Sequence, residues 1–409
     1  MFGDAAPMTP LTQALAHQFY FAIGQITKPA MHQLGRARRG RAAKIGFINQ
    51  RDAQPPQAGI KRDGGSGCAA TNNGEVKRGG TEGIKIALHH ASKQGFTNGR
   101  TCWQYRGIKI ERGTKMAFAN ANGISLCYEV FEAAEKRSVE PLILIRGLGT
   151  QMIQWPQAFI DYFTHAGFDV IIFDNRDVGE SSKLDAAGVP DIMALLAGAE
   201  AGASFPVPYG IADMADDVIG LMDALGIEKA HIWGMSLGGM VAQHLAFSHG
   251  PRIGKIICVM SSSGDASLPQ PAASALAPPD SEDEAELIDY MTQNLGQHAS
   301  PAFPTPEADR RALAEKLVKR CWHPQGIIRQ MAAALADGAR TARLKNIAVS
   351  FMVIHGDADT LIDISCGQHI AETVPRALWR PVAGMGHDIG PGLEDEIGPD
   401  VLAFLGASQ

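Results

Sequence analysis

Short apolar runs alternate with longer amphipathic segments from about residue 140 to the end of the chain. The runs have four to six residues and are mostly apolar, which is typical of parallel strands buried on both faces. They lie at residues 141–145, 170–173, 231–235, 256–260, 349–354 and 377–382. Strands that alternate with helices in this way predict an α/β fold, with a mostly parallel central sheet and helices on both faces.

The segments between these runs show helical periodicity. Residues 211–225 carry apolar side chains at helical spacing with acids on the other face, and Gly226 marks a stop. Between residues 263 and 344 the pattern changes to a Pro- and Ala-rich loop. Helical segments follow it at residues 284–295, 307–320 and 326–336. We expect this insertion to form a lid, with the loop 183–209 as part of the same wall.

The pattern around Ser236 is that of a nucleophile elbow. An apolar run leads into Gly-Met-Ser-Leu-Gly at residues 234–238, and a helix-like segment follows. Such a strand-to-helix turn lifts a serine hydroxyl above the edge of a sheet. The strained turn requires small neighbours, which Gly234 and Gly238 provide. Ser236 is therefore the candidate nucleophile, and a serine in an ordinary turn is the alternative.

Candidate acids follow the run at 349–354, where Asp357, Asp359 and Asp363 crowd one loop. A serine nucleophile needs an imidazole base, and a buried carboxylate fixes the tautomer of that imidazole. The Gly-x-x-Asp spacing from Gly356 resembles the acid loop of α/β-hydrolases, and this resemblance favours Asp359 over the alternative, Asp357.

The candidate base is His387. It lies in a Gly-Met-Gly-His loop directly after the last apolar run. By contrast, we expect His355 to end a strand and His369 to lie on the face of a helix.

The order Ser236, Asp359, His387 is the order that the α/β-hydrolase fold uses, and the chain resembles that superfamily. Leu-Ile-Arg-Gly-Leu-Gly-Thr-Gln-Met at 144–152, an Asp-x-Arg-x-x-Gly-x-Ser turn from Asp174 and the His387 loop are closest in appearance to the aclacinomycin methylesterase-like branch. We expect the charged groups of the Asp174 turn to bind one another and the backbone. They would then hold this loop beside the elbow.

The resemblance also implies an oxyanion hole. Its donors would be the backbone N–H groups of Leu148 and Leu237, with Gly147 supporting the loop. Preorganised donors of this kind are commonly worth ~3 kcal/mol each. The family usually carries His-Gly where this chain has Arg146-Gly147. Because the donor is backbone, the departure affects the hydrogen bonds around the hole more than the hole itself.

The first 115 residues differ in composition from the rest. They contain 18 Lys and Arg and 6 Asp and Glu, a formal charge of +12, against −18 for the remainder. A segment with so little hydrophobic pattern is expected to be disordered, or to lie upstream of the true start. A basic tail that binds nucleic acid or acidic membranes is the alternative. We favour a catalytic domain at 116–409, because a hairpin-like pattern begins at Met116.

The sequence predicts no metal site and no cofactor. It shows neither metal-ligand spacing nor a phosphate-binding glycine loop, and no nucleic-acid partner is expected. No stretch approaches the ~20 apolar residues of a membrane span. The six cysteines are scattered, without Cys-x-x-Cys pairs, which favours free thiols and a cytoplasmic location.

Two classes of function remain. The first is a serine hydrolase that cleaves carboxylic esters with an apolar portion through an acyl-enzyme, with acyl transfer or perhydrolysis at the same triad as its variants. The second is a non-catalytic binding protein with a hydrolase fold. Dehalogenases and epoxide hydrolases of this fold carry an aspartate at the elbow, so Ser236 argues against both.

Overall fold

The computed structural model describes residues 116–192, 194–195, 206–270, 279 and 281–406. The expectations for residues 1–115, and for much of the loop 183–209, lie outside these described residues. Within the part of the chain that is described, no helix is both long and apolar enough to cross a membrane.

The core is an eight-stranded sheet in the order β1-β2-β4-β3-β5-β6-β7-β8. The strands are β1 (Ala117–Ala121), β2 (Ile124–Phe131), β3 (Leu142–Ile145), β4 (Val170–Phe173), β5 (Ala230–Met235), β6 (Ile253–Val259), β7 (Ser350–Gly356) and β8 (Leu378–Val382). β2 is antiparallel to both β1 and β4, and the other neighbours are parallel. The β1–β2 hairpin turns at Asn122-Gly123, where both φ angles are positive, as tight hairpin turns require.

The helices connect these strands. They are α3 (Gln157–His165), α5 (Ile211–Leu225), α6 (Leu237–Ser248), α7 (Glu284–Gln297), α8 (Glu307–Arg320), α9 (Pro324–Asp337), α10 (Thr341–Leu344), α11 (Ile364–Thr373) and α12 (Leu393–Leu405), with 3-10 turns at η1 (Met152–Gln154), η2 (Asp185–Ala187) and η3 (Gly250–Arg252). α5 ends at Gly226 in a left-handed conformation with φ of 68°, as the sequence predicts.

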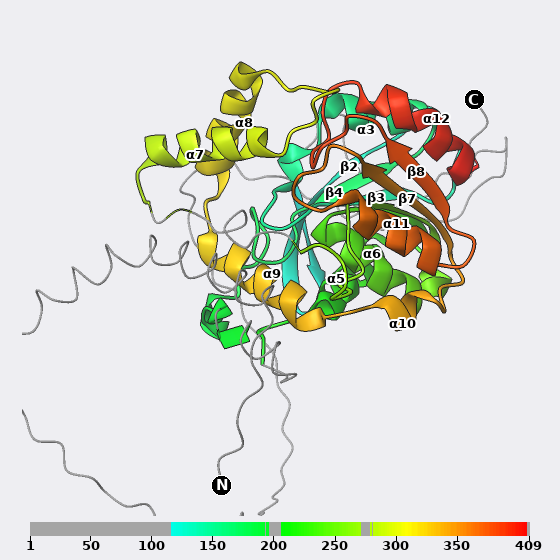
Figure 1. Cartoon of the computed structure of the whole chain (residues 1–409), viewed down its shortest axis with the longest axis horizontal. Coiled ribbons are helices and arrows are strands. Elements are labelled where there is room, and N and C mark those ends of the chain that lie inside the picture. Colours follow the sequence, from blue (N-terminus) through cyan, green and yellow to red (C-terminus); the bar gives the residue numbers. More distant parts are fainter. Residues whose placement is uncertain (1–115, 193, 196–205, 271–278, 280, 407–409) are drawn as a thin grey trace, which may run out of the picture. The chain divides into compact units, whose positions relative to one another are not determined.

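Helices cover both faces of the sheet (Figure 1). The side chains of β3 alternate between two cores, Leu142 and Leu144 facing one and Ile143 and Ile145 the other. The first core also contains side chains of α3 and α12, and the second contains side chains of α5, α6 and α11. The expected α/β-hydrolase architecture, with a mostly parallel sheet between two helical layers, is therefore confirmed.

The segment between β6 and β7 contains α7, α8, α9 and α10. α7 and α8 pack against each other beside the sheet, and α9 runs past α5 (Figure 1). α7 begins at an aspartate cap, because Asp283 accepts hydrogen bonds from the N–H groups of Ala285 and Glu286. The three longer helices lie where the sequence predicts them.

Candidate active site

Three loops at one edge of the sheet carry the candidate triad. Ser236 follows β5, Asp359 follows β7 and His387 follows β8. These strands are parallel members of one sheet, so their carboxyl ends meet at the same edge. Ligand sites of open α/β sheets form at this edge.

Ser236 has a strained backbone. Between β5 and α6 it adopts φ of 55° and ψ of −119°, a combination of backbone angles that residues other than glycine rarely adopt. A Cβ on Gly234 would lie 2.2 Å from the carbonyl oxygen of Gly238, and a Cβ on Gly238 would lie 2.3 Å from that of Ile145. The elbow can therefore close only because both positions are glycine.

The loop after β3 lies against the candidate nucleophile. A Cβ on Gly147 would be only 3.1 Å from Cβ of Ser236, and Leu148 is the next residue. Leu237 is the first residue of α6, so its N–H is among those that a helix leaves without an intrahelical acceptor. The positive end of the helix dipole favours negative charge there.

Asp359 and His387 are hydrogen-bonded to each other. His387 Nδ1 lies 2.7 Å from Asp359 Oδ2, and the side chain of Asp359 is fully buried. The other carboxylate oxygen accepts hydrogen bonds of 2.9 Å from the N–H groups of Leu361 and Ile362. Burial alone would raise the pKa of Asp359, but the hydrogen bonds from His355 and His387 outweigh it and hold that pKa well below its usual range.

The other two acids of this loop have different partners. Asp357 is exposed and accepts a hydrogen bond of 2.6 Å from the N–H of Gly384. Asp363 caps α11 by accepting from the N–H of Ser365 at 2.9 Å. Within the described part of the chain, Asp359 is the carboxylate that is hydrogen-bonded to His387.

The inserted segment holds the loop of His387. The backbone N–H of His387 donates to the carbonyl of His298 at 2.6 Å, and that of Gly386 donates to Ser300 Oγ at 2.8 Å. Ser300 also donates to the carboxylate of Asp388 from both its N–H and its hydroxyl. Burial raises the pKa of Asp388, and burial together with the nearby His387 lowers that of His298.

Gln330 of α9 joins the insertion to the loop of Leu148. Its fully buried amide accepts from the N–H of Gly149 and donates to the carbonyl of Arg176, both at 2.8 Å. A Cβ on Gly149 would lie 2.8 Å from the side chain of Ile327, so the two segments pack tightly. The insertion therefore contacts the candidate oxyanion loop as well as the histidine loop.

The charged groups of the turn from Asp174 bind the backbone as expected, but their ion pairs are with other helices and not with one another, because each of these side chains faces a helix that packs on the turn. Arg176 forms a bidentate pair with Asp217, with distances of 2.6 and 2.7 Å. Asp174 accepts from Arg320 of α8 at 2.6 Å and from the backbone N–H of Met152 at 2.8 Å. Because Asn175 donates to the carbonyl of Arg146, this turn also supports the loop after β3.

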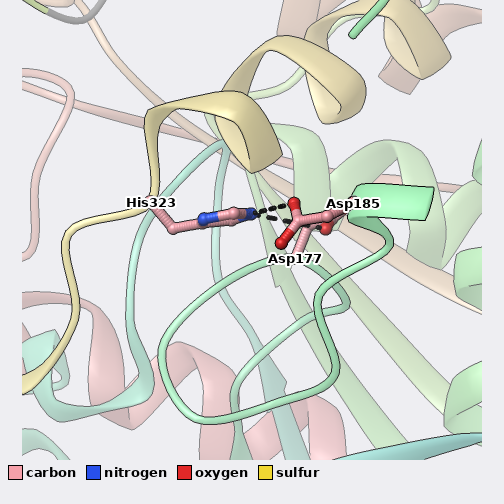
Figure 2. Close-up of side chains that lie close together, drawn as sticks. All are labelled: Asp177, Asp185 and His323. Atoms are coloured by element: carbon pink, nitrogen blue, oxygen red, sulfur yellow. Dashed lines mark ion pairs between the residues drawn. The ribbon is translucent and has the colours of Figure 1, made fainter. Parts of the chain in front are cut away.

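A second charged cluster, which we call the Arg329 cluster, consists of Asp177, Asp185, His323 and Arg329. The first three could each offer a metal ligand, with ligand atoms within 4.8 Å of one another (Figure 2). Arg329 Nη2 lies 2.8 Å from a carboxylate oxygen of each aspartate and 2.9 Å from His323 Nε2. The guanidinium thus supplies the positive charge that a metal would bring, and it ties α9 to the turn from Asp174.

A family model described as alpha/beta hydrolase fold matches residues 140–390, which is more than half of the chain. The chain belongs to the alpha/beta hydrolase family. The matched region includes Ser236, Asp359 and His387.

Curated relatives of this hydrolase are themselves hydrolases. The putative carbamate hydrolase RutD of Caulobacter segnis is 29% identical over 270 residues, covering 64% of this chain and 89% of the relative. The rhodomycin D methylesterase DnrP of Streptomyces peucetius is 24% identical over 302 residues, covering 66% of this chain and 91% of the relative. The expected resemblance to this superfamily is confirmed, and a methylesterase is among the relatives.

Solved structures show the same fold. A hydrolase from Pseudomonas aeruginosa PA01 is 28% identical and aligns with a TM-score of 0.52 over 73% of this chain and 100% of its own. The enol-lactonase from Burkholderia xenovorans LB400 is 22% identical and aligns with a TM-score of 0.54, over 71% and 100% respectively.

Arg146 lies directly before Gly147 in the loop after β3. Its buried guanidinium stacks 4.7 Å from the ring centroid of Trp155, and Nη1 lies 3.3 Å from the sulfur of Met235. Burial lowers the pKa of Arg146 to about 10. The side chain of Arg146 therefore packs behind the loop, while the loop backbone at Gly147 lies against Ser236.

Proposed function

We propose that this hydrolase cleaves carboxylic esters through an acyl-enzyme, with Ser236 as nucleophile, His387 as general base and Asp359 as the acid that orients it. The observation that carries the proposal is the bond of 2.7 Å from His387 Nδ1 to Asp359 Oδ2. Because Nδ1 donates its proton to the carboxylate, the free lone pair of the imidazole is on Nε2. That lone pair can accept the proton of a serine hydroxyl during attack.

The proposed reaction begins when Ser236 Oγ attacks the ester carbonyl carbon and its proton moves to His387 Nε2. The oxyanion of the tetrahedral intermediate accepts hydrogen bonds from the N–H groups of Leu148 and Leu237. Donors of this kind are worth about 3 kcal/mol each in related sites. The imidazolium gives its proton to the leaving alkoxide, and water then repeats both steps to release the acid.

The proposed substrate is a small ester with an apolar portion. Relatives named for a carbamate, a methyl ester and an enol-lactone support a carbonyl substrate. We assign the reaction to a catalytic domain of residues 116–409, with residues 263–344 as its lid. The contacts of Gln330 and His298 with the two site loops support that role for the insertion. The cytoplasmic location stays a prediction from the scattered cysteines.

A panel of nitrophenyl esters of increasing acyl length tests the proposal, with the full chain and Ser236→Ala compared. We expect hydrolysis by the wild-type chain and a loss on the order of a million-fold in turnover in the variant, as in other triads. Near-normal hydrolysis by Ser236→Ala would refute the assignment.

Adding an alcohol or hydrogen peroxide to the same assays separates the variants of the chemistry. If new ester or peracid formed in preference to free acid, acyl transfer or perhydrolysis would replace hydrolysis as the activity. A folded wild-type chain without turnover on any ester would instead favour a non-catalytic binding protein.

A further inference from the structure

A second imidazole, that of His355, contacts the candidate acid. His355 is the penultimate residue of β7, and its side chain is fully buried. Its Nε2 lies 3.3 Å from Asp359 Oδ2, the same oxygen that is bonded to His387. The triad proposed above gives no role to this histidine.

His355 also holds the backbone of the acid loop. Its Nε2 lies 2.9 Å from the carbonyl oxygen of Ile362, whose own N–H donates to Asp359 Oδ1. Both neighbours of Nε2 are acceptors, so the ring proton is on Nε2 and is shared between them. One imidazole thus contacts the carboxylate directly and also binds Ile362, the residue whose N–H bonds the other carboxylate oxygen.

The ring has little freedom to move. A Cβ on Gly367 of α11 would lie 2.3 Å from His355 Nδ1 and 2.9 Å from its Cβ, so the helix passes directly against the ring. Within the described residues, Nδ1 is buried without a hydrogen-bond partner. The Nδ1 edge of the ring therefore packs against Gly367, and the Nε2 edge faces the acid loop.

We propose that His355 is a positioning residue for the acid, which keeps Asp359 Oδ2 directed at His387 Nδ1. The inference rests on the proposed function, because it assumes that Asp359 orients the catalytic base. It differs from a packing role, in which the imidazole only fills space between β7 and α11.

Substitutions that separate shape from hydrogen bonding distinguish these roles. His355→Phe keeps a ring but removes the donor. His355→Gln loses the ring but can place an N–H near the position of Nε2, whereas the shorter amide in His355→Asn falls near Nδ1. If His355 positions the acid, the His355→Phe and His355→Asn variants should each have a kcat about tenfold lower than wild type, with KM nearly unchanged. The His355→Gln variant should keep most of the wild-type kcat. Tenfold corresponds to about 1.4 kcal/mol of activation free energy, which is at the upper end of the net contribution of a typical hydrogen bond.

A proton NMR measurement on the full chain distinguishes the two roles, because a purely space-filling role of His355 would leave the measured resonance unchanged. The Nδ1 proton of His387, assigned by its loss in His387→Gln, reports the bond to Asp359 without any substrate. We expect this resonance to shift upfield or disappear in the Phe and Asn variants and to persist in Gln. If Phe retained both the resonance and kcat, or if Asn matched Gln, the positioning role would be wrong. Should the Phe variant not fold, the comparison of Gln with Asn decides.

His244 provides the matched control. It is buried, and its Nε2 lies 2.8 Å from Asp337 Oδ1, in a His–Asp pair outside the triad. His244→Phe is expected to lower thermal stability and to leave the His387 resonance in place. Failure of the proposed function would be seen separately, as a wild-type chain that hydrolyses no ester. The resonance would still show whether His355 holds the acid.

Discussion

Replacing the acid by its amide, in Asp359→Asn, is the substitution whose effect follows most directly from the hydrogen bonds. One carboxylate oxygen accepts from two backbone N–H groups, and the other accepts from His387. An amide has a single acceptor oxygen. If that oxygen keeps the backbone donors, the NH2 group faces His387 Nδ1 and requires it to be unprotonated. The imidazole proton then sits on Nε2, where it blocks acceptance of the serine proton.

We therefore expect Asp359→Asn to lower kcat about 10⁴-fold, as the wrong tautomer does in other triads. That loss corresponds to about 5.4 kcal/mol of activation free energy at 1.36 kcal/mol per decade. The assay is hydrolysis of the best nitrophenyl ester at saturating concentration, with circular dichroism and thermal melting to confirm folding.

Asp357→Asn is the matched control, because Asp357 is exposed and its bond to Gly384 can be kept by an amide oxygen. Asp363→Asn is a second control, since it alters only the cap of α11. Both should change kcat by less than about tenfold, which is within 1.4 kcal/mol. A large loss in Asp357→Asn with a mild effect at Asp359 would refute the assignment of the acid. Mild effects in all three variants would refute the tautomer argument itself.

Three further predictions concern pH, the insertion and the N-terminal segment. Because the lowered pKa of Asp359 keeps it ionised, its protonation should not contribute to the acid limb of the kcat/KM profile, which should have unit slope; a slope of two would contradict this. Arg329→Met should lower the free energy of unfolding by about 3 kcal/mol, because it leaves the buried carboxylate of Asp177 without its arginine partner, whereas Arg311→Met breaks an exposed pair and should leave melting unchanged. The fragment 116–409 should melt within a few degrees of the full chain and keep its activity; a large drop would show that residues before Met116 stabilise the fold.

The strands and helices could be predicted from the sequence because each is specified locally. Continuous apolar runs indicate buried parallel strands, and the helix at 211–225 combines an amphipathic pattern with a glycine stop. The candidate triad could be proposed for a similar reason, since glycine spacing marks each of its loops. The choice of Asp359 over Asp357 depended on a resemblance, because spacing alone does not show which carboxylate will face the histidine.

The contacts that support the site could not be predicted in this way. Ser300 lies 88 residues before Asp388, and Gln330 lies 181 residues after Gly149. Such contacts depend on how the insertion packs onto the sheet edge, which no local pattern encodes. The sequence predicts only that His355 ends a strand, and the contact of His355 with Asp359 depends on the path of the loop between them.

The central claim is that Ser236 is the nucleophile, and active-site labelling tests it most directly. The full chain is treated with a fluorophosphonate, digested, and mapped by mass spectrometry, with Ser236→Ala as the control. We predict a single covalent adduct on the peptide that contains Ser236 and no adduct in the variant. An adduct on another serine, or ester hydrolysis by a chain that resists the reagent, would contradict the account.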